Sequence, residues 1–182
     1  MNYSVYLRPL EVPDAKISYK WRNNPLIWKF TEYKPNKIID FATETDWIKN
    51  SLKIKNDHRF AICLLETGQY IGNIQLINIE DKKGDFHVFI GDTFYWGKGI
   101  AKEATQLILN YGFIRLGLDF MNLKVHQDNT IAKAIYQKMG FIKTSQDGDF
   151  ISMILEKNHF LRLNKKAKIE ENIALKEALI PN

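Results

Sequence analysis

The order of strand-like and helix-like segments in the second half of the chain restricts its fold most. A strand pattern at 85–91 is followed by helical periodicity at 99–116, a strand pattern at 122–126, helical periodicity at 130–139, and strand patterns at 141–145 and 150–155. Such alternation is typical of a sheet with a parallel portion, because a helix usually connects parallel strands. The second half therefore predicts an α/β architecture.

The first half predicts antiparallel strands and two helices. A short strand at 3–8 precedes a helix that begins at Pro13-Asp14 and ends at Asn23-Asn24-Pro25, since proline disfavours helical geometry in the residue before it. Three strand patterns at 59–66, 70–79 and 85–91 are joined by short turns, which favours a meander. A second helix is expected from a stripe at spacings of three and four residues: Ile38, Phe41, Thr45, Ile48 and Leu52.

Composition limits the classes of protein that remain. A chain of 182 residues fits one domain, and its charges interrupt every apolar run before it reaches a membrane span. The N-terminus does not resemble a signal peptide, and the single cysteine, Cys63, lies in an apolar run, so we expect a cytoplasmic protein. The net charge of +5 suits a polyanionic ligand. Its basic residues are scattered, so no nucleic-acid partner is expected.

The stretch 95–104, which reads YWGKGIAKEA, joins a strand to a long helix. Glycines at a helix N-terminus let a phosphate approach unpaired backbone N–H groups, and Lys98 and Lys102 could add positive charge. A turn that only starts the helix is the alternative. A dinucleotide-binding loop is excluded, because Lys102 replaces its third glycine, residues 92–96 separate it from the strand, and Asp119 precedes the next strand.

A second motif, NTIAKAIYQKMGF, occupies residues 129–141. Together the two motifs resemble the signature segments of the GNAT acetyltransferase superfamily, especially its ribosomal-protein-alanine-acetyltransferase-like branch. Gly99 and Ala101 match the Gln/Arg-x-x-Gly-x-Gly/Ala loop, with Trp96 at the first position. The second motif matches Asn-x-x-Ala-x-x-x-Tyr-x-Lys-x-Gly-Phe. The resemblance covers about residues 3–156.

The resemblance implies a fold and a cosubstrate. It implies a single GNAT-type α/β (α+β) domain at 1–156, with a mixed, mostly antiparallel sheet and a splayed central parallel pair flanked by helices. Residues 157–182 are then a C-terminal helical or partly disordered tail. Acetyl-CoA is implied as the cosubstrate and no metal is expected. Its binding residues would be Phe89, Ile90, Gly91, Gly97, Lys98, Gly99, Ile100, Ala101, Lys102, Asn129 and Tyr136.

The resemblance also implies a proton donor, whereas the proton acceptor stays open. Tyr136 matches the residue that usually lies against the sulfur of CoA, where a phenol can protonate the departing thiolate; an aromatic that only packs its helix is the alternative. Asp85 and His87 share one face of a strand and are the candidate bases. A polar strand face or a chain of waters are the alternatives, and His126 is a weaker candidate.

The acceptor is expected to be a small-molecule primary amine. Residues near the first two helices would bind it, and we name Trp21, Arg22, Trp28 and Tyr33, although both tryptophans could belong to the core. These residues favour a nucleotide-linked amino sugar, followed by protein N-termini and then polyamines. A non-catalytic acyl-CoA-binding sensor is the alternative from another class. We expect no membrane association, and a homodimer remains open.

Overall fold

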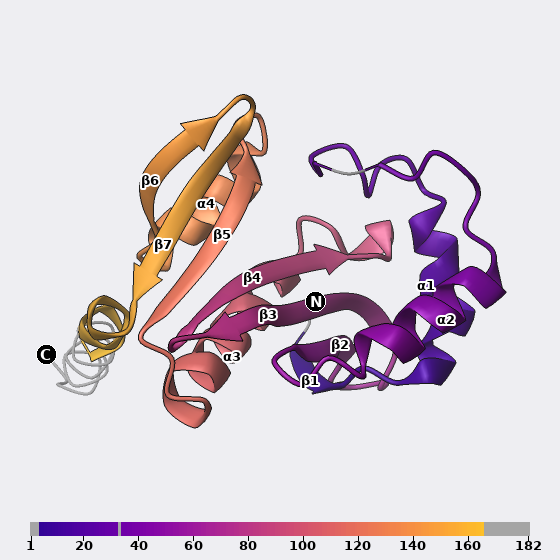
Figure 1. Cartoon of the computed structure of the whole chain (residues 1–182), viewed down its shortest axis with the longest axis horizontal. Helices are drawn as coiled ribbons and strands as arrows, with labels where there is room; N and C mark the ends of the chain where they lie inside the picture. Colours follow the sequence, from indigo (N-terminus) through magenta and orange to yellow (C-terminus); the bar gives the residue numbers. More distant parts are fainter. Residues whose placement is uncertain (1–3, 33, 166–182) are drawn as a thin grey trace, which may run out of the picture.

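The computed structural model of the protein describes residues 4–32 and 34–165. Its centre is a seven-stranded sheet with the strand order β1-β2-β3-β4-β5-β7-β6 (Figure 1). The strands are β1 (Val5–Pro9), β2 (His58–Leu64), β3 (Tyr70–Glu80), β4 (Lys83–Ile90), β5 (Phe120–His126), β6 (Ile142–Asp147) and β7 (Phe150–Glu156). The mixed α/β fold predicted from the sequence is confirmed.

The parallel portion of the sheet is one short pair of strands. All other neighbours run antiparallel, whereas β4 and β5 run parallel. Lys83–Asp85 of β4 pair with Phe120–Asn122 of β5, and the rest of the two described strands is unpaired with each other. The strands therefore diverge beyond Asp85 (Figure 1), which confirms the expected splay.

Helices cover both faces of the sheet. They are α1 (Ala15–Arg22), α2 (Phe41–Ser51), α3 (Ile100–Asn110) and α4 (Thr130–Lys138). Alternate residues of a strand point to opposite faces. Accordingly, Ile62 belongs to the core beneath α3 and α4, whereas Ala61 packs with Ile48 of α2. One face thus carries α3 and α4, and the other carries α1 and α2.

The buried face of α2 differs from the expected stripe. Ile48 is fully buried, but Ile38, Phe41 and Leu52 are 84%, 44% and 43% exposed. The helix begins only at Phe41, because the Asp40 side chain caps it by accepting from the Thr43 N–H at 2.7 Å. The residues that join Ile48 on the buried face are Glu44 and Ser51. The apolar periodicity predicted the wrong buried face because an acid, Glu44, lies on the face of α2 that is buried.

The first part of the proposed tail packs on the domain. Residues 157–165 form a helix directly after β7. Phe160 is 2% exposed and stacks near Phe113 at a ring-centroid distance of 5.1 Å. Gly140 lies so close to this helix that a Cβ there would meet Leu163 at 2.6 Å. Residues 157–165 thus pack on the domain as a helix, while the predicted boundary at residue 156 stays a prediction; residues 166–182 lie outside the described part of the chain.

Candidate active site

The open edge of β4 presents backbone groups beside the splay. Gly91 donates its N–H to the Ile71 carbonyl of β3 at 2.8 Å. Because successive residues of a strand point their N–H groups to opposite sides, Phe89 also faces β3, whereas Val88 and Ile90 face the open edge. The Ile90 carbonyl accepts from the Trp96 indole N–H at 2.8 Å. Of the three predicted residues Phe89, Ile90 and Gly91, Ile90 is the one whose backbone polar groups face the opening.

The glycine loop leads from β4 into α3 in a conformation that favours glycine. Gly97 and Gly99 have φ values of +73° and +80°. Gly99 is the N-cap of α3 and no side chain caps the helix, so Glu103 N–H to Gly99 O, at 3.1 Å, begins the helical hydrogen bonds. The N–H groups of Ile100, Ala101 and Lys102 precede that bond in the first turn. No heavy atom lies within 4 Å of a Cβ built at either glycine.

These features fit a pyrophosphate. Unpaired amides at a helix N-terminus attract anions, and two glycines keep side chains away from the backbone there. Lys102 is exposed in the first turn of α3. The Lys98 ammonium group lies 3.4 Å from the centroid of the Phe94 ring and 5.4 Å from that of Tyr95. The loop is therefore suited to the phosphates of a nucleotide cosubstrate, and its role in binding them stays a prediction.

The second motif forms the start and the body of α4. Asn129 is the N-cap, and its side chain accepts from the Ala132 N–H at 3.2 Å. Tyr136 is 9% exposed. Its ring lies 5.8 Å from Phe86 of β4 and 5.8 Å from Phe141. Burial raises the pKa of Tyr136 to about 12, so the phenol keeps its proton at neutral pH.

A cavity of about 190 Å³ lies on the opposite face, between the sheet and the segments around α1 and α2. Its floor comes from three strands and includes Arg59, Phe60, Asn73, Ile74, Gln75, His87, Val88 and Phe89. Its walls come from the chain before α1, from α1 and α2, and from the segment between them: Leu10, Arg22, Ile27, Trp28, Thr31 and Trp47. Because β4 contributes to this cavity and also contacts Tyr136, it connects the two faces.

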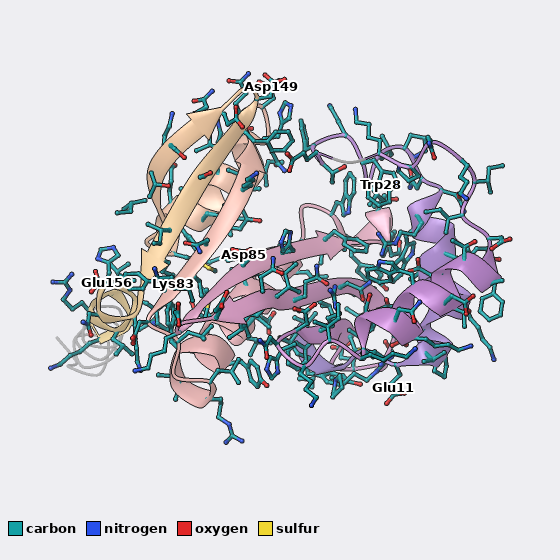
Figure 2. The ribbon with its side chains drawn as sticks, in the orientation of Figure 1. Glu11, Trp28, Lys83, Asp85, Asp149 and Glu156 are labelled. Carbon is teal, nitrogen blue, oxygen red and sulfur yellow. The ribbon has the colours of Figure 1, made fainter. Side chains whose placement is uncertain are left out.

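Of the two candidate bases, His87 lines the cavity and Asp85 does not. Partial desolvation in the concave site lowers the pKa of His87, and the Arg59 charge acts in the same direction against the opposing effect of Asp85. The imidazole is thus neutral and can accept a proton. Asp85 lies near the closed end of the splay (Figure 2) and accepts from the Asn78 side chain at 3.0 Å.

The predicted acceptor residues have different positions. Arg22 and Trp28 line the cavity. The Trp28 indole donates to the Arg22 carbonyl at 2.7 Å, and Figure 2 shows Trp28 toward the α1–α2 connection. Trp21 is outside the lining and packs against Tyr70 and Phe89, at 4.7 and 6.3 Å between ring centroids. Tyr33 lies outside the described residues.

The connection between α1 and α2 reaches across the splay to the end of β5. The Phe30 ring lies 5.5 Å from that of His126, and the Lys124 ammonium lies 3.8 Å from the Glu32 carboxylate. His126 also packs against Phe150 of β7 at 5.3 Å. The contacts of His126 thus belong to this bridge over the opening, and His126 does not line the cavity.

Sequence reasoning missed several residues of the cavity, above all Arg59 and Trp47. The Arg59 guanidinium lies 5.4 Å from the Trp47 ring centroid, and that of Arg22 lies 4.3 Å from it. The sequence contained a weak signal for Arg59, because this charged residue begins an otherwise apolar strand pattern. Nothing in the sequence indicated that α2 would bring Trp47 to the same place.

Three features together define an acyl-CoA-dependent acetyltransferase. They are the splayed parallel pair of strands, the glycine loop at a helix N-terminus, and a buried tyrosine on the face of the sheet opposite the cavity. Residues 4–142 match the family model described as acetyltransferase (GNAT) domain, and the chain belongs to this family. The enzyme class and the superfamily resemblance predicted from the sequence are thereby confirmed.

Three known proteins illustrate the relationship. The chain is 30% identical to spermidine N(1)-acetyltransferase of Escherichia coli K12, over 76% of this chain and 73% of that protein. It is similar to the structure of apo FdhC, a nucleotide-linked sugar GNAT, with 26% identity, a TM-score of 0.75 and 94% of each chain covered. The structure of Vibrio cholerae spermidine N-acetyltransferase in complex with CoA and spermine has the same fold, with 23% identity, a TM-score of 0.78, and 86% and 98% of the chains covered.

Two further observations concern the residues that the structure describes. No helix among them is long and apolar enough to cross a membrane. Within residues 4–32 and 34–165, no group of three or more His, Cys, Asp or Glu side chains is arranged to hold a metal ion.

Proposed function

We propose that the protein transfers the acetyl group of acetyl-CoA to the primary amine of a nucleotide-linked amino sugar. The observation that carries this proposal is the cavity lining. It contains Arg22 and Arg59 together with aromatic rings, and none of the described residues that line the cavity is acidic. Such a lining suits an anionic acceptor with flat or apolar parts. The similarity to apo FdhC supports the same choice.

Two other acceptors remain as alternatives. The similarity to spermidine acetyltransferases favours a polyamine, but a polycation would meet guanidinium groups rather than carboxylates in this cavity. A protein N-terminus is the acceptor implied by the ribosomal-type motif resemblance. A non-catalytic acyl-CoA sensor would need no acceptor cavity, whereas His87 and two arginines line one here.

The cosubstrate would bind along the loop and the open edge of β4. The backbone of residues 97–102 would hold the pyrophosphate, and the thioester would lie at the open edge of β4, which the Val88 and Ile90 N–H groups face. Asn129 caps α4 and so fixes the start of the helix that carries Tyr136. When bound, acetyl-CoA supplies an activated acyl group. A backbone N–H fixed beside the thioester stabilises negative charge that develops on its oxygen.

The proton transfers divide between the two faces of β4. His87, on the cavity side, would accept the proton that the attacking amine loses as the C–N bond forms. Tyr136, on the other side, would donate a hydrogen bond to the sulfur that strengthens as the C–S bond breaks. The balance is one amide and one thiol, with the protein groups returned to their starting states by solvent. Attack in a ternary complex needs no covalent acyl-enzyme, which suits the buried position of the single thiol, Cys63.

A panel of amines tests the proposed acceptor. Release of free CoA from acetyl-CoA would be measured with 4-amino sugar nucleotides, with peptides that begin with Ser or Ala, and with spermidine. We expect the highest kcat/KM for a sugar nucleotide. Faster turnover of a peptide or of spermidine would replace the proposed acceptor, and amine-independent CoA binding without any turnover would support the sensor.

The pH profile tests His87. Because its pKa is lowered from the ordinary value of about 6.5, the neutral imidazole persists below that pH and the acidic limb of kcat due to His87 should lie below it. We expect His87→Gln to lower kcat by about 100-fold and to remove this limb, since general-base catalysis contributes roughly that much or more. The acceptor amine titrates in the assays of the wild type and of the variant alike, so its effect on the pH profile is the same in both.

The matched control is His159→Gln, which changes a histidine outside the cavity and should leave kcat and the pH profile unaltered. An unchanged acidic limb in folded His87→Gln would assign the base to Asp85 or to water.

We also keep a cytoplasmic location as part of the proposal, supported by the buried and unpaired thiol of Cys63. Whether the protein forms a homodimer would be measured by light scattering on the full chain.

A further inference from the structure

The cavity contains a pair of guanidinium groups whose carboxylate partners lie behind them. Arg22 Nε lies 3.2 Å from Glu44, and Arg59 Nη2 lies 2.7 Å from Asp57. The two carboxylate side chains are only 2% and 4% exposed and do not line the cavity. Each acid therefore orients its arginine from the protein side, and the cationic groups are what a ligand meets.

The two arginines share one aromatic surface. Their guanidinium carbons lie 4.3 Å and 5.4 Å from the ring centroid of Trp47. Arg22 also lies 5.5 Å from the Trp28 ring. Two cations close to one indole repel each other, so other contacts must hold them in place. Glu44 and Asp57 provide those contacts. The fold thus holds two like charges near each other at the wall of the cavity.

Arg59 has one donor without a partner. Its Nη2 donates to Asp57 at 2.7 Å and its Nη1 donates to Gln75 of β3. Its Nε is buried and has no hydrogen-bond partner among residues 4–32 and 34–165, and the whole side chain is only 9% exposed. Buried donors are nearly always paired in folded proteins. Arg59 as a residue lines the cavity, so an acceptor atom of a bound ligand is one partner that this N–H could gain through a small movement of the side chain.

We infer that Arg59 is a specificity-determining residue whose Nε–H binds an anionic oxygen of the acceptor, with Arg22 as the second cation and Trp47 as an adjoining aromatic surface. The inference rests on the proposed transfer to an amine in this cavity and goes beyond it by naming the group that is recognised. The oxygen could belong to the phosphate of a nucleotide sugar or to a carboxylate, and the proposed function favours the phosphate.

The test compares Arg59→Lys with a matched control in the full chain. Lysine keeps the charge and loses the Nε–H donor. Arg8 of β1 forms a similar pair with Asp14, at 2.6 and 2.9 Å, but lies outside the cavity, so Arg8→Lys controls for loss of a partly buried ion pair. Each variant is assayed for the KM of the best acceptor in the amine panel, the KM of acetyl-CoA and kcat. In parallel, calorimetry on CoA-saturated protein measures binding of UDP, inorganic phosphate, citrate and spermidine.

We expect Arg59→Lys to raise the KM of the acceptor by about 10- to 100-fold, the range typical of a hydrogen bond to a charged group. The kcat and the KM of acetyl-CoA should change less than about 3-fold, and UDP affinity should fall with the acceptor's. Tighter binding of UDP and phosphate than of citrate identifies a phosphate as the recognised group; the reverse order identifies a carboxylate. Arg8→Lys should keep the wild-type values.

An unchanged acceptor KM in folded Arg59→Lys would overturn the inference, and so would an equal rise in Arg8→Lys, which would show a structural role. Preferred binding of spermidine would do the same. If no sugar nucleotide is turned over but another anionic amine is, and its KM depends on Arg59, the proposed acceptor fails while the inference stands. Should Arg59→Lys not fold, Trp47→Leu replaces it, because Trp47 is 37% exposed, and an unchanged acceptor KM there overturns the inference.

Discussion

Replacement of Gly99 by valine is expected to weaken CoA binding at least 100-fold while the protein stays folded. Gly99 has a φ of +80°, where a β-branched residue is strained by an estimated ~1–3 kcal/mol. A Cβ there has no heavy atom of the described residues within 4 Å, so the side chain would point into the space that we assign to the pyrophosphate. Calorimetry with CoA and the thermal unfolding midpoint of the same sample measure the two effects.

Gly117 offers a matched control, because its φ is +69° and a Cβ there also meets nothing within 4 Å. Gly117→Val therefore carries a similar backbone strain away from the loop. We expect it to lower the unfolding midpoint about as much as Gly99→Val does and to leave CoA affinity unchanged. Unaltered CoA affinity in folded Gly99→Val would remove the loop from the cosubstrate site.

Local sequence patterns were sufficient to predict most elements of this fold. The Asn23-Asn24-Pro25 stop agrees with the end of α1 at Arg22, and the apolar runs that favoured a meander form β2, β3 and β4. The position of β7 between β5 and β6 could not be read from the order of segments, because it depends on which edges are left to pair. Phe160 was also missed, since an isolated aromatic in a basic stretch carries no periodic signal.

The buried acid of α2 shows a different limit. Glu44 is 1% exposed, accepts from Ser18 at 2.7 Å and pairs with Arg22. Apolar periodicity assigns a charged residue to the solvent face, since an unpaired buried carboxylate is costly. The partner that makes burial tolerable lies on α1, 22 positions earlier in the chain. Tertiary pairing therefore reversed the face that the sequence pattern indicated.

The candidate site likewise has a part that local sequence patterns predict and a part that depends on tertiary packing. The glycine loop and the Asn129–Tyr136 motif are each one continuous stretch of sequence, so local rules could predict the conformation of each. The cavity that we assign to the acceptor is assembled from three strands, two helices and two connecting segments, and no single segment carries its pattern. Arg59 and Trp47 could be found only once the packing of α2 on β2 and β3 was known.

The position of Tyr136 limits what its phenol can do. Burial raises its pKa to about 12, whereas a free thiol has a pKa of about 8.5. Complete proton transfer from this phenol to a solvated thiolate would be uphill by about 3.5 pK units, or roughly 5 kcal/mol. The same apolar surroundings, which include Phe86 and Phe141, would also raise the pKa of a thiol held there. A hydrogen bond that strengthens as the sulfur gains charge is therefore the effect to expect.

Tyr136→Phe should accordingly lower kcat by about 100-fold, the lower range for general acid catalysis, and change the KM of acetyl-CoA by less than about 3-fold. Phenylalanine keeps the ring contacts with Phe86 and Phe141, so the unfolding midpoint should shift little. Steady-state kinetics with the best acceptor measures the split between kcat and KM. Tyr111→Phe, which removes a phenol bonded to His58 at 2.9 Å, serves as the control and should keep the wild-type kcat. A wild-type kcat in folded Tyr136→Phe would leave this tyrosine with a packing role alone, because the only group removed is the hydroxyl that we propose to act on the sulfur.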